Sequence, residues 1–147
     1  MHEVIRPRII RIKRLDYEFM CVDVSNRSPE EACGLLAGQI KGELYQAMCV
    51  FPTTNFLHSA TRYRIDPAEQ LAAFNQMDLQ GLEMVGIYHS HPNGPDSPSP
   101  TDIAEAYYPE AVHLIWFRQN GVWVCNAYAI RETGVDSVRI ELLDGNN

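Results

Sequence analysis

Short runs of hydrophobic residues, separated by turns rich in glycine and polar residues, dominate the chain and predict a fold built mainly of strands. These runs predict strands at Cys33–Ile40, Leu44–Phe51, Glu83–His89, Val112–Phe117, Val122–Ile130 and Val138–Leu143. Gly42 and the Asn120-Gly121 pair lie between neighbouring runs, so each predicts a hairpin. The segment Arg62–Ile65 predicts one further short strand.

Three other segments predict helices. Residues 15–26 have apolar side chains at roughly helical spacing. A second helix is expected to begin at Asp66-Pro67 and end at Gly81, because Asp caps helices, Pro favours the first turn and Gly the C-terminal end. Its inward face is expected to carry Leu71, Phe74, Met77 and Leu79. A short helix at Asp102–Tyr108, capped by Thr101, completes a fold of the α+β or mixed α/β class.

The N-terminal segment combines basic and apolar residues. Arginine and lysine alternate with Ile9, Ile10 and Ile12 over residues 6–14. Charged residues are typical of strands at the edge of a sheet, so this segment predicts an edge strand with one solvated face.

Composition and charge narrow the class of protein. The chain has 147 residues, of which 46% are apolar and 21% charged, as expected for one globular domain spanning residues 1–147. Its net charge is 12 − 19 = −7, which disfavours a general nucleic-acid partner. The four cysteines form no C-x-x-C pair and are expected to be small apolar residues. Because no signal peptide or membrane-spanning stretch is recognisable, we expect a cytoplasmic protein without a membrane partner.

The candidate chemistry lies at the end of the strand Glu83–His89. His89 and His91 are two residues apart, so their imidazoles project from the same face. Asp102 follows across a loop with four prolines in residues 92–100 and can return a carboxylate to these imidazoles. Two histidines and one carboxylate are zinc ligands that leave a fourth position for water, which is typical of a catalytic zinc site.

The pattern His89-Ser90-His91-Pro92 followed by Ser99-Pro100-Thr101-Asp102 resembles the JAMM motif, H-x-H-x7-S-x2-D, of the MPN+ zinc metalloproteases. The family's upstream glutamate matches Glu31, within the segment Pro29 to Leu36. The resemblance runs from about residue 15 to 130. It implies a curved mixed sheet flanked by helices, and one zinc per chain.

The resemblance also implies roles for the matching residues. His89, His91 and Asp102 hold the zinc, Glu31 is the general base, and Ser99 donates a hydrogen bond to the developing oxyanion. Members of the family cut after the Gly-Gly tail of ubiquitin or ubiquitin-like proteins. Only ten residues separate His91 from Asp102, which favours a compact prokaryotic member acting on a ubiquitin-like sulfur-carrier protein.

Other interpretations remain open at this point. Without the histidine motif, Glu30 and Glu31 would be interpreted as a solvated pair at the start of a helix. Ser99 could instead cap the helix that follows it, and capping competes with oxyanion donation for its one hydroxyl. Asp96 is an alternative ligand, and Ser90 a residue that orients an imidazole. The remaining histidines, His2, His58 and His113, are interpreted as surface or core residues, and Trp116, Trp123 and Phe117 as core. Rival functions are a non-catalytic MPN scaffold and a zinc hydrolase acting on a small peptide or amide.

Overall fold

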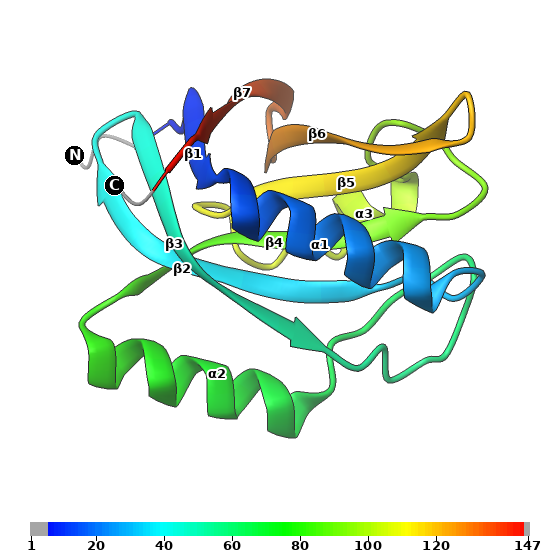
Figure 1. Ribbon diagram of the computed structural model, residues 1–147, viewed down its shortest axis with the longest axis horizontal. Helices are drawn as coiled ribbons and strands as arrows, with labels where there is room; N and C mark the ends of the chain where they lie inside the picture. Colours follow the sequence, from blue (N-terminus) through cyan, green and yellow to red (C-terminus); the bar gives the residue numbers. More distant parts are fainter. Residues whose placement is uncertain (1–5, 146–147) are drawn as a thin grey trace.

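The computed structural model describes residues 6–145 and shows seven strands that form one closed, mixed sheet (Figure 1). Neighbouring strands follow the order β1-β3-β2-β4-β5-β6-β7, and β1 and β7 pair to close the sheet. Three pairs are parallel, β1–β3, β1–β7 and β4–β5, and the other four are antiparallel. The strands are β1 Ile9–Lys13, β2 Cys33–Lys41, β3 Leu44–Thr53, β4 Glu83–His91, β5 Val112–Gln119, β6 Val122–Arg131 and β7 Gly134–Leu143. The predicted α+β class and curved mixed sheet are confirmed.

The prediction of an edge strand at the N-terminus is wrong. Strand β1 pairs with β3 on one side and β7 on the other. Its isoleucines Ile10 and Ile12 are fully buried, whereas Arg11 forms an ion pair with Glu141 of β7 at 3.1 Å. The charges therefore lie opposite a partner strand, which local sequence does not reveal.

Two long helices lie on different sides of β2 (Figure 1). Helix α1, Arg14–Arg27, packs on a core inside the closed sheet through Met20 and Val24. Helix α2, Pro67–Gln80, packs through Ala73 and Met77 on a second core that contains alternate residues of β2. The sheet thus has an α1 face and an α2 face, each with its own apolar cluster.

The ends of α2 were predicted correctly, but its inward face was only partly so. The Asp66 carboxylate accepts hydrogen bonds from Ala68 N and Glu69 N, and Gly81 has the left-handed conformation at φ 67°. Met77 is buried and Phe74 partly buried, whereas Leu71 and Leu79 are 61% and 81% exposed. The buried face is centred on Ala73 and Met77. Leu71 lies two residues before Ala73 and Leu79 two residues after Met77. Two residues turn the helix by about 200°, so both leucines point away from the buried face.

Two further features are relevant to the site. The segment Arg62–Ile65 is not a strand, because only Ile65 forms a single bridge, with Asn55. Among residues 6–145, no helix has the length and apolar character needed to cross a bilayer.

Candidate metal centre

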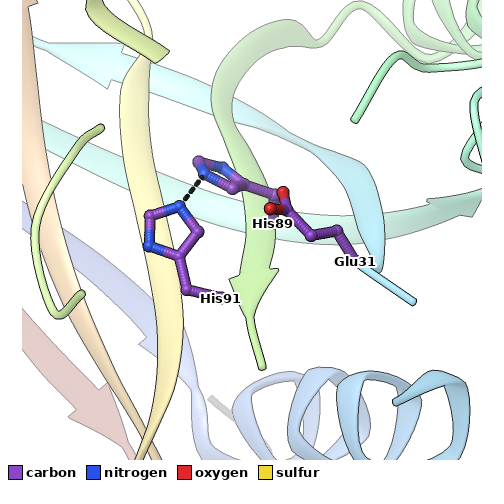
Figure 2. Close-up of side chains that lie close together, drawn as sticks. All are labelled: Glu31, His89 and His91. Carbon is purple, nitrogen blue, oxygen red and sulfur yellow. Dashed lines mark hydrogen bonds between the residues drawn. The ribbon is translucent and has the colours of Figure 1, made fainter. Parts of the chain in front are cut away.

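The two histidines lie at the C-terminal end of β4, on the α2 face. Both are buried, and their Nε2 atoms are 3.0 Å apart (Figure 2). Alternate residues of a strand point to the same side, so Ile87, His89 and His91 continue one face from the apolar cluster to the site. The site thus lies at the polar end of the apolar cluster on the α2 face.

Asp102 completes a group of three donor atoms. Its Oδ2 lies 3.1 Å from His89 Nε2 and 3.0 Å from His91 Nε2. A tetrahedral zinc with Zn–N distances of about 2.0–2.1 Å has neighbouring donor atoms roughly 3.3 Å apart. The three donors fit such an ion in both spacing and chemistry.

Asp102 belongs to the short helix α3, Pro100–Ala104, which begins earlier and ends earlier than predicted. Its cap is Ser99 instead of Thr101: Ser99 Oγ accepts a hydrogen bond from Asp102 N at 3.1 Å, and Ser99 N donates to Asp102 Oδ2 at 2.9 Å. A serine hydroxyl has acceptor lone pairs as well as one proton. Capping uses a lone pair and leaves the Ser99 proton free to donate, so the two functions expected to compete are compatible.

The proline-rich loop before α3 is fixed by hydrogen bonds to its carbonyl groups. His91 Nδ1 donates to Pro95 O at 2.8 Å, which orients the imidazole with Nε2 toward Asp102. Arg118 of β5 donates to Pro92 O at 3.0 Å, and Tyr128 of β6 donates to Asp96 O at 2.8 Å. Asp96 is exposed, and the carboxylate that hydrogen-bonds to both imidazoles is that of Asp102.

The charges of the three donors depend on burial and on their mutual hydrogen bonds. Burial lowers the pKa of His89. Burial also opposes protonation of His91, but hydrogen bonds with Asp102 and the Pro95 carbonyl raise its pKa. Burial alone would raise the pKa of Asp102, yet the hydrogen bonds with His89 and His91 hold it well below its usual range. Asp102 is therefore an ionised carboxylate at neutral pH.

Glu31 is a second carboxylate beside the imidazoles. It lies just before β2, is 3% exposed, and has an oxygen within 4.8 Å of ring nitrogens of both His89 and His91 (Figure 2). Its Oε1 is buried and has no hydrogen-bond partner in the described protein. Asp102 lies within hydrogen-bonding distance of both imidazoles and so occupies the ligand position, whereas Glu31 lies beside it, where it could act on a bound water.

The environment of Glu31 favours a proton at neutral pH. Burial raises its pKa to about 8, with a smaller lowering by His91 and a raising by Asp102. The neighbouring Glu30 instead forms an exposed pair with His58 at 3.2 Å, as expected for a solvated residue. The two adjacent glutamates thus have different environments.

Asn55 organises the backbone around Glu31, and sequence reasoning missed it. Its Nδ2 donates to Glu31 O at 3.0 Å, and also to the carbonyls of Ser59 and Arg62, while its Oδ1 accepts from Leu57 N and Arg64 N. The side chain is fully buried although it lies in a loop. Asparagine hydrogen-bonding to nearby backbone is common in loops, but no local pattern indicates its reach to Glu31.

Two other side chains support the site in ways that were not predicted. The hydroxyl of Ser90 accepts a hydrogen bond from Ala32 N at 2.8 Å. Ser90 therefore ties β4 to the residue after Glu31, and the prediction that it orients an imidazole is wrong. Tyr63 stacks on His89, with ring centroids 4.4 Å apart, and covers the site from the loop before α2.

The remaining aromatic residues have structural positions. His58 is exposed and His113 buried, as expected, whereas His2 lies outside the described residues. Trp116 and Phe117 are buried, and Trp123 packs against the α1-face core.

The sequence is similar to those of several known proteins. The family model for prokaryotic homologs of the JAB domain matches residues 18–133. A probable TtuB-protein conjugate cleaving protease of Thermus thermophilus is 40% identical over 65% of this chain, a desampylase of Haloferax volcanii 35% over 59%, and a CysO-cysteine peptidase of Mycobacterium tuberculosis 38% over 59%. The matched segment spans only 60%, 62% and 58% of these three relatives, respectively.

Solved structures agree with the fold. A solution structure from Desulfitobacterium hafniense has a TM-score of 0.85 and 34% identity, over 92% of this chain and 94% of that one. A second, from Salinibacter ruber, has a TM-score of 0.67 and 27% identity, over 90% of this chain and 91% of that one.

Proposed function

The chain belongs to the prokaryotic homologs of the JAB domain, and from this premise we propose that it is a zinc-dependent peptidase or isopeptidase. Its substrate is a ubiquitin-like or sulfur-carrier protein, cut after a C-terminal Gly-Gly. The observation that carries the proposal is the group of three donor atoms 3.0–3.1 Å apart with a buried, unpaired carboxylate beside it.

In this proposal His89, His91 and Asp102 hold one zinc ion. Zinc, when bound, polarises the scissile carbonyl and lowers the pKa of a water ligand from about 15.7 toward 7. Glu31 would accept a proton from the attacking water and deliver it to the leaving nitrogen. Burial raises the pKa of Glu31 to about 8 in the metal-free protein, and the positive charge of a bound zinc would favour the ionised carboxylate that accepts this proton. Ser99 donates its free hydroxyl proton to the carbonyl oxygen as negative charge develops there.

The relatives support the class of substrate. Their names describe a protease that cleaves protein conjugates and a peptidase that acts on a CysO-cysteine compound. A cytoplasmic location is part of the proposal, since the four cysteines are free, as is usual in a reducing compartment.

The test uses protein purified without added metal. We expect about one zinc per chain by elemental analysis. We also expect cleavage of a cognate carrier, extended beyond Gly-Gly, directly after the second glycine by intact mass. A chelator should abolish cleavage and added zinc restore it.

The rival functions have distinct outcomes in the same experiment. A scaffold protein would take up no zinc and cut nothing. Equal cutting of unrelated unfolded peptides would indicate a general peptidase, and cleavage of small amides without the carrier would indicate a small-molecule hydrolase. Either result contradicts the carrier proposal.

A further inference from the structure

The two histidines of the metal centre differ in the surroundings of their second ring nitrogen. A histidine that binds zinc through Nε2 carries its proton on Nδ1, and this N–H usually donates to a carbonyl or carboxylate that fixes the ring. In His91 it donates to Pro95 O at 2.8 Å. In His89, Nδ1 is buried and has no hydrogen-bond partner among residues 6–145. The orientation of the His89 ring therefore depends on a contact of another kind.

The ring of Tyr63 provides that contact. Its centroid lies 4.4 Å from the centroid of the His89 ring, and the two planes are inclined by 22°, so the rings are stacked. The His91 ring lies 4.8 Å from the same imidazole but at a steep angle of 66°. The torsion that rotates an imidazole about its bond to Cβ has broad preferences in histidine. A flat ring stacked on the imidazole restricts this rotation.

The backbone on either side of Tyr63 is itself fixed. Asn55 Nδ2 donates to Arg62 O at 3.0 Å, and Arg64 N donates to Asn55 Oδ1 at 3.1 Å. The side chain of Arg62 also pairs with Glu105 at 3.0 Å, and Glu105 ends the short helix that carries the third ligand. Tyr63 thus lies in a loop that is attached to its surroundings at several points, as a residue that holds another ring requires.

We propose that Tyr63 is a positioning residue of the metal centre, whose ring holds the imidazole of His89 with Nε2 directed toward the metal. The inference rests on the proposed function, because it assigns Tyr63 a role at the zinc site. A hydrogen bond from the proline-rich loop orients His91, and stacking from the loop before α2 orients His89. The two imidazole ligands therefore depend on different segments and on different physical contacts.

Three roles of Tyr63 are distinguishable by the side chain that can replace it. If Tyr63 only filled space, an apolar side chain such as leucine would serve as well. If its hydroxyl acted on the metal or the substrate, phenylalanine would not replace it. Positioning by stacking needs the flat ring alone, because a flat ring restricts the rotation of the imidazole beside it. Phenylalanine should then replace tyrosine, whereas leucine should not.

The experiment compares Tyr63→Phe and Tyr63→Leu in the full-length protein. Tyr107→Leu is the matched control, since it makes the same exchange at a tyrosine that is 77% exposed just beyond α3. Zinc affinity is measured by competition with a chromophoric chelator. Co²⁺ then replaces zinc, and its visible absorption reports the geometry of the ligands. The His89 ring protons are followed by NMR in the metal-free protein, because a stacked aromatic ring shifts their resonances.

We expect Tyr63→Leu to lower zinc affinity about tenfold, the size typical for loss of a group that orients a metal ligand. A tenfold change leaves a tight site filled, so affinity is measured instead of zinc content. The cobalt spectrum of Tyr63→Leu should differ from that of the parent, and its His89 resonances should shift. Tyr63→Phe and Tyr107→Leu should resemble the parent in all three measurements. Tyr63→Ala takes the place of Tyr63→Leu if the latter does not fold.

Parent-like affinity and cobalt spectrum in Tyr63→Leu would overturn the inference, and so would an equal loss in Tyr63→Phe, which would assign the effect to the hydroxyl. Carrier cleavage by the parent with unchanged zinc affinity in Tyr63→Leu would remove the role of Tyr63 and leave the peptidase. Zinc binding that depends on the Tyr63 ring, without any cleavage of the carrier, would instead remove the peptidase and leave the role of Tyr63. A parent protein that binds no zinc contradicts both.

Discussion

Strands β2 and β4 have two faces that differ in the residues they bury. On the α1 face, Ala32, Leu36, Val85 and Tyr88 join one apolar core inside the closed sheet. On the α2 face the same strands carry apolar residues such as Leu35 and Ile87, and the edge they share near the site is polar and buried, with His89 and His91 at the end of β4 and Glu31 just before β2. Residues adjacent in sequence therefore belong to different environments.

The difference shows where close packing is required. A Cβ at Gly34 would lie 2.3 Å from the Tyr88 ring and 2.6 Å from Phe51 O, so only glycine fits between these strands. The α2 face instead ends in buried ionisable groups, since Glu31, His89 and His91 are at most 4% exposed there. We infer that the α1 face mainly provides stability and the α2 face mainly provides chemistry.

The test with the largest expected effects replaces two neighbouring residues of β4, one on each face, with alanine. His89→Ala should abolish metal binding and activity but leave the free energy of unfolding of the metal-free protein close to the parent. Tyr88→Ala should destabilise by about 3–5 kcal/mol, because it removes a buried ring. Elemental analysis and urea unfolding measure both. A His89→Ala protein that fails to fold, or a Tyr88→Ala protein of parent stability, contradicts the separation of the two faces.

Glu31→Gln should lower turnover by about 10²–10⁴-fold while zinc stays bound, because the amide keeps the shape and cannot accept the proton. Glu30→Gln is the matched control, since its half-buried side chain points to His58 instead of the metal centre, and it should turn over at the parent rate. Steady-state rates and zinc content of both variants provide the comparison. Parent-like turnover in Glu31→Gln would assign the base to another residue.

The buried carboxyl of Glu31 should also make the metal-free protein sensitive to pH. Its pKa is about 8 in the folded chain and about 4.5 in the unfolded chain, so the folded state binds more protons between these values. Stability from this residue is full below pH 4.5 and declines up to pH 8. The parent should therefore lose stability between pH 4.5 and pH 8, whereas Glu31→Gln has no carboxyl here to titrate. The free energy of unfolding of the variant minus that of the parent should rise across this window by on the order of 2–5 kcal/mol. Denaturant unfolding at pH 5, 6.5 and 8 measures it, and a constant difference would refute the raised pKa.

Two substitutions at Ser99 separate capping from catalysis. Ser99→Ala should lower turnover by roughly 10²–10³-fold, by loss of an oxyanion donor, and destabilise by about 1 kcal/mol, by loss of the cap. Ser99→Gly should show the same fall in turnover with only a few tenths of a kcal/mol in stability. If turnover follows stability instead of the hydroxyl, Ser99 acts only as a cap.

The smallest expected effect on turnover is at Asn55. Asn55→Ala should reduce kcat about tenfold, because Glu31 loses a backbone anchor, while zinc content stays at the parent level. The loss of five hydrogen bonds should cost about 1–3 kcal/mol or more in stability. Asn75→Ala, exposed on α2, serves as the control. Unchanged kcat would show that Asn55 supports only the loop.

Local patterns predicted the features that depend on local contacts. The six main strands, the ends of α2 and the histidine pair at the end of β4 follow from apolar runs, capping residues and alternation. Errors occurred where a distant segment decides the outcome. Pairing with β7 gives β1 two neighbours, and Asn55 organises residues 62–64 where a strand was expected.

The same distinction applies to the site. The spacing of His89, His91 and Asp102 is visible in the sequence, and the structure brings the three side chains together. The stacking of Tyr63, the bond from Ala32 to Ser90 and the unpaired His113 depend on how strands and loops pack. Short motifs do not contain that information.

The closure of the sheet affects how readily the protein associates with other chains in a crowded solution. Open sheets expose unpaired N–H and C=O groups along their outer strands, which can capture extended segments of other chains and start aggregation. Here β1 and β7 pair with each other, so within residues 6–145 the sheet has no outermost strand. If the protein receives one extended tail, as proposed, this closure would limit its pairing with extended chains in general, including newly made copies of itself.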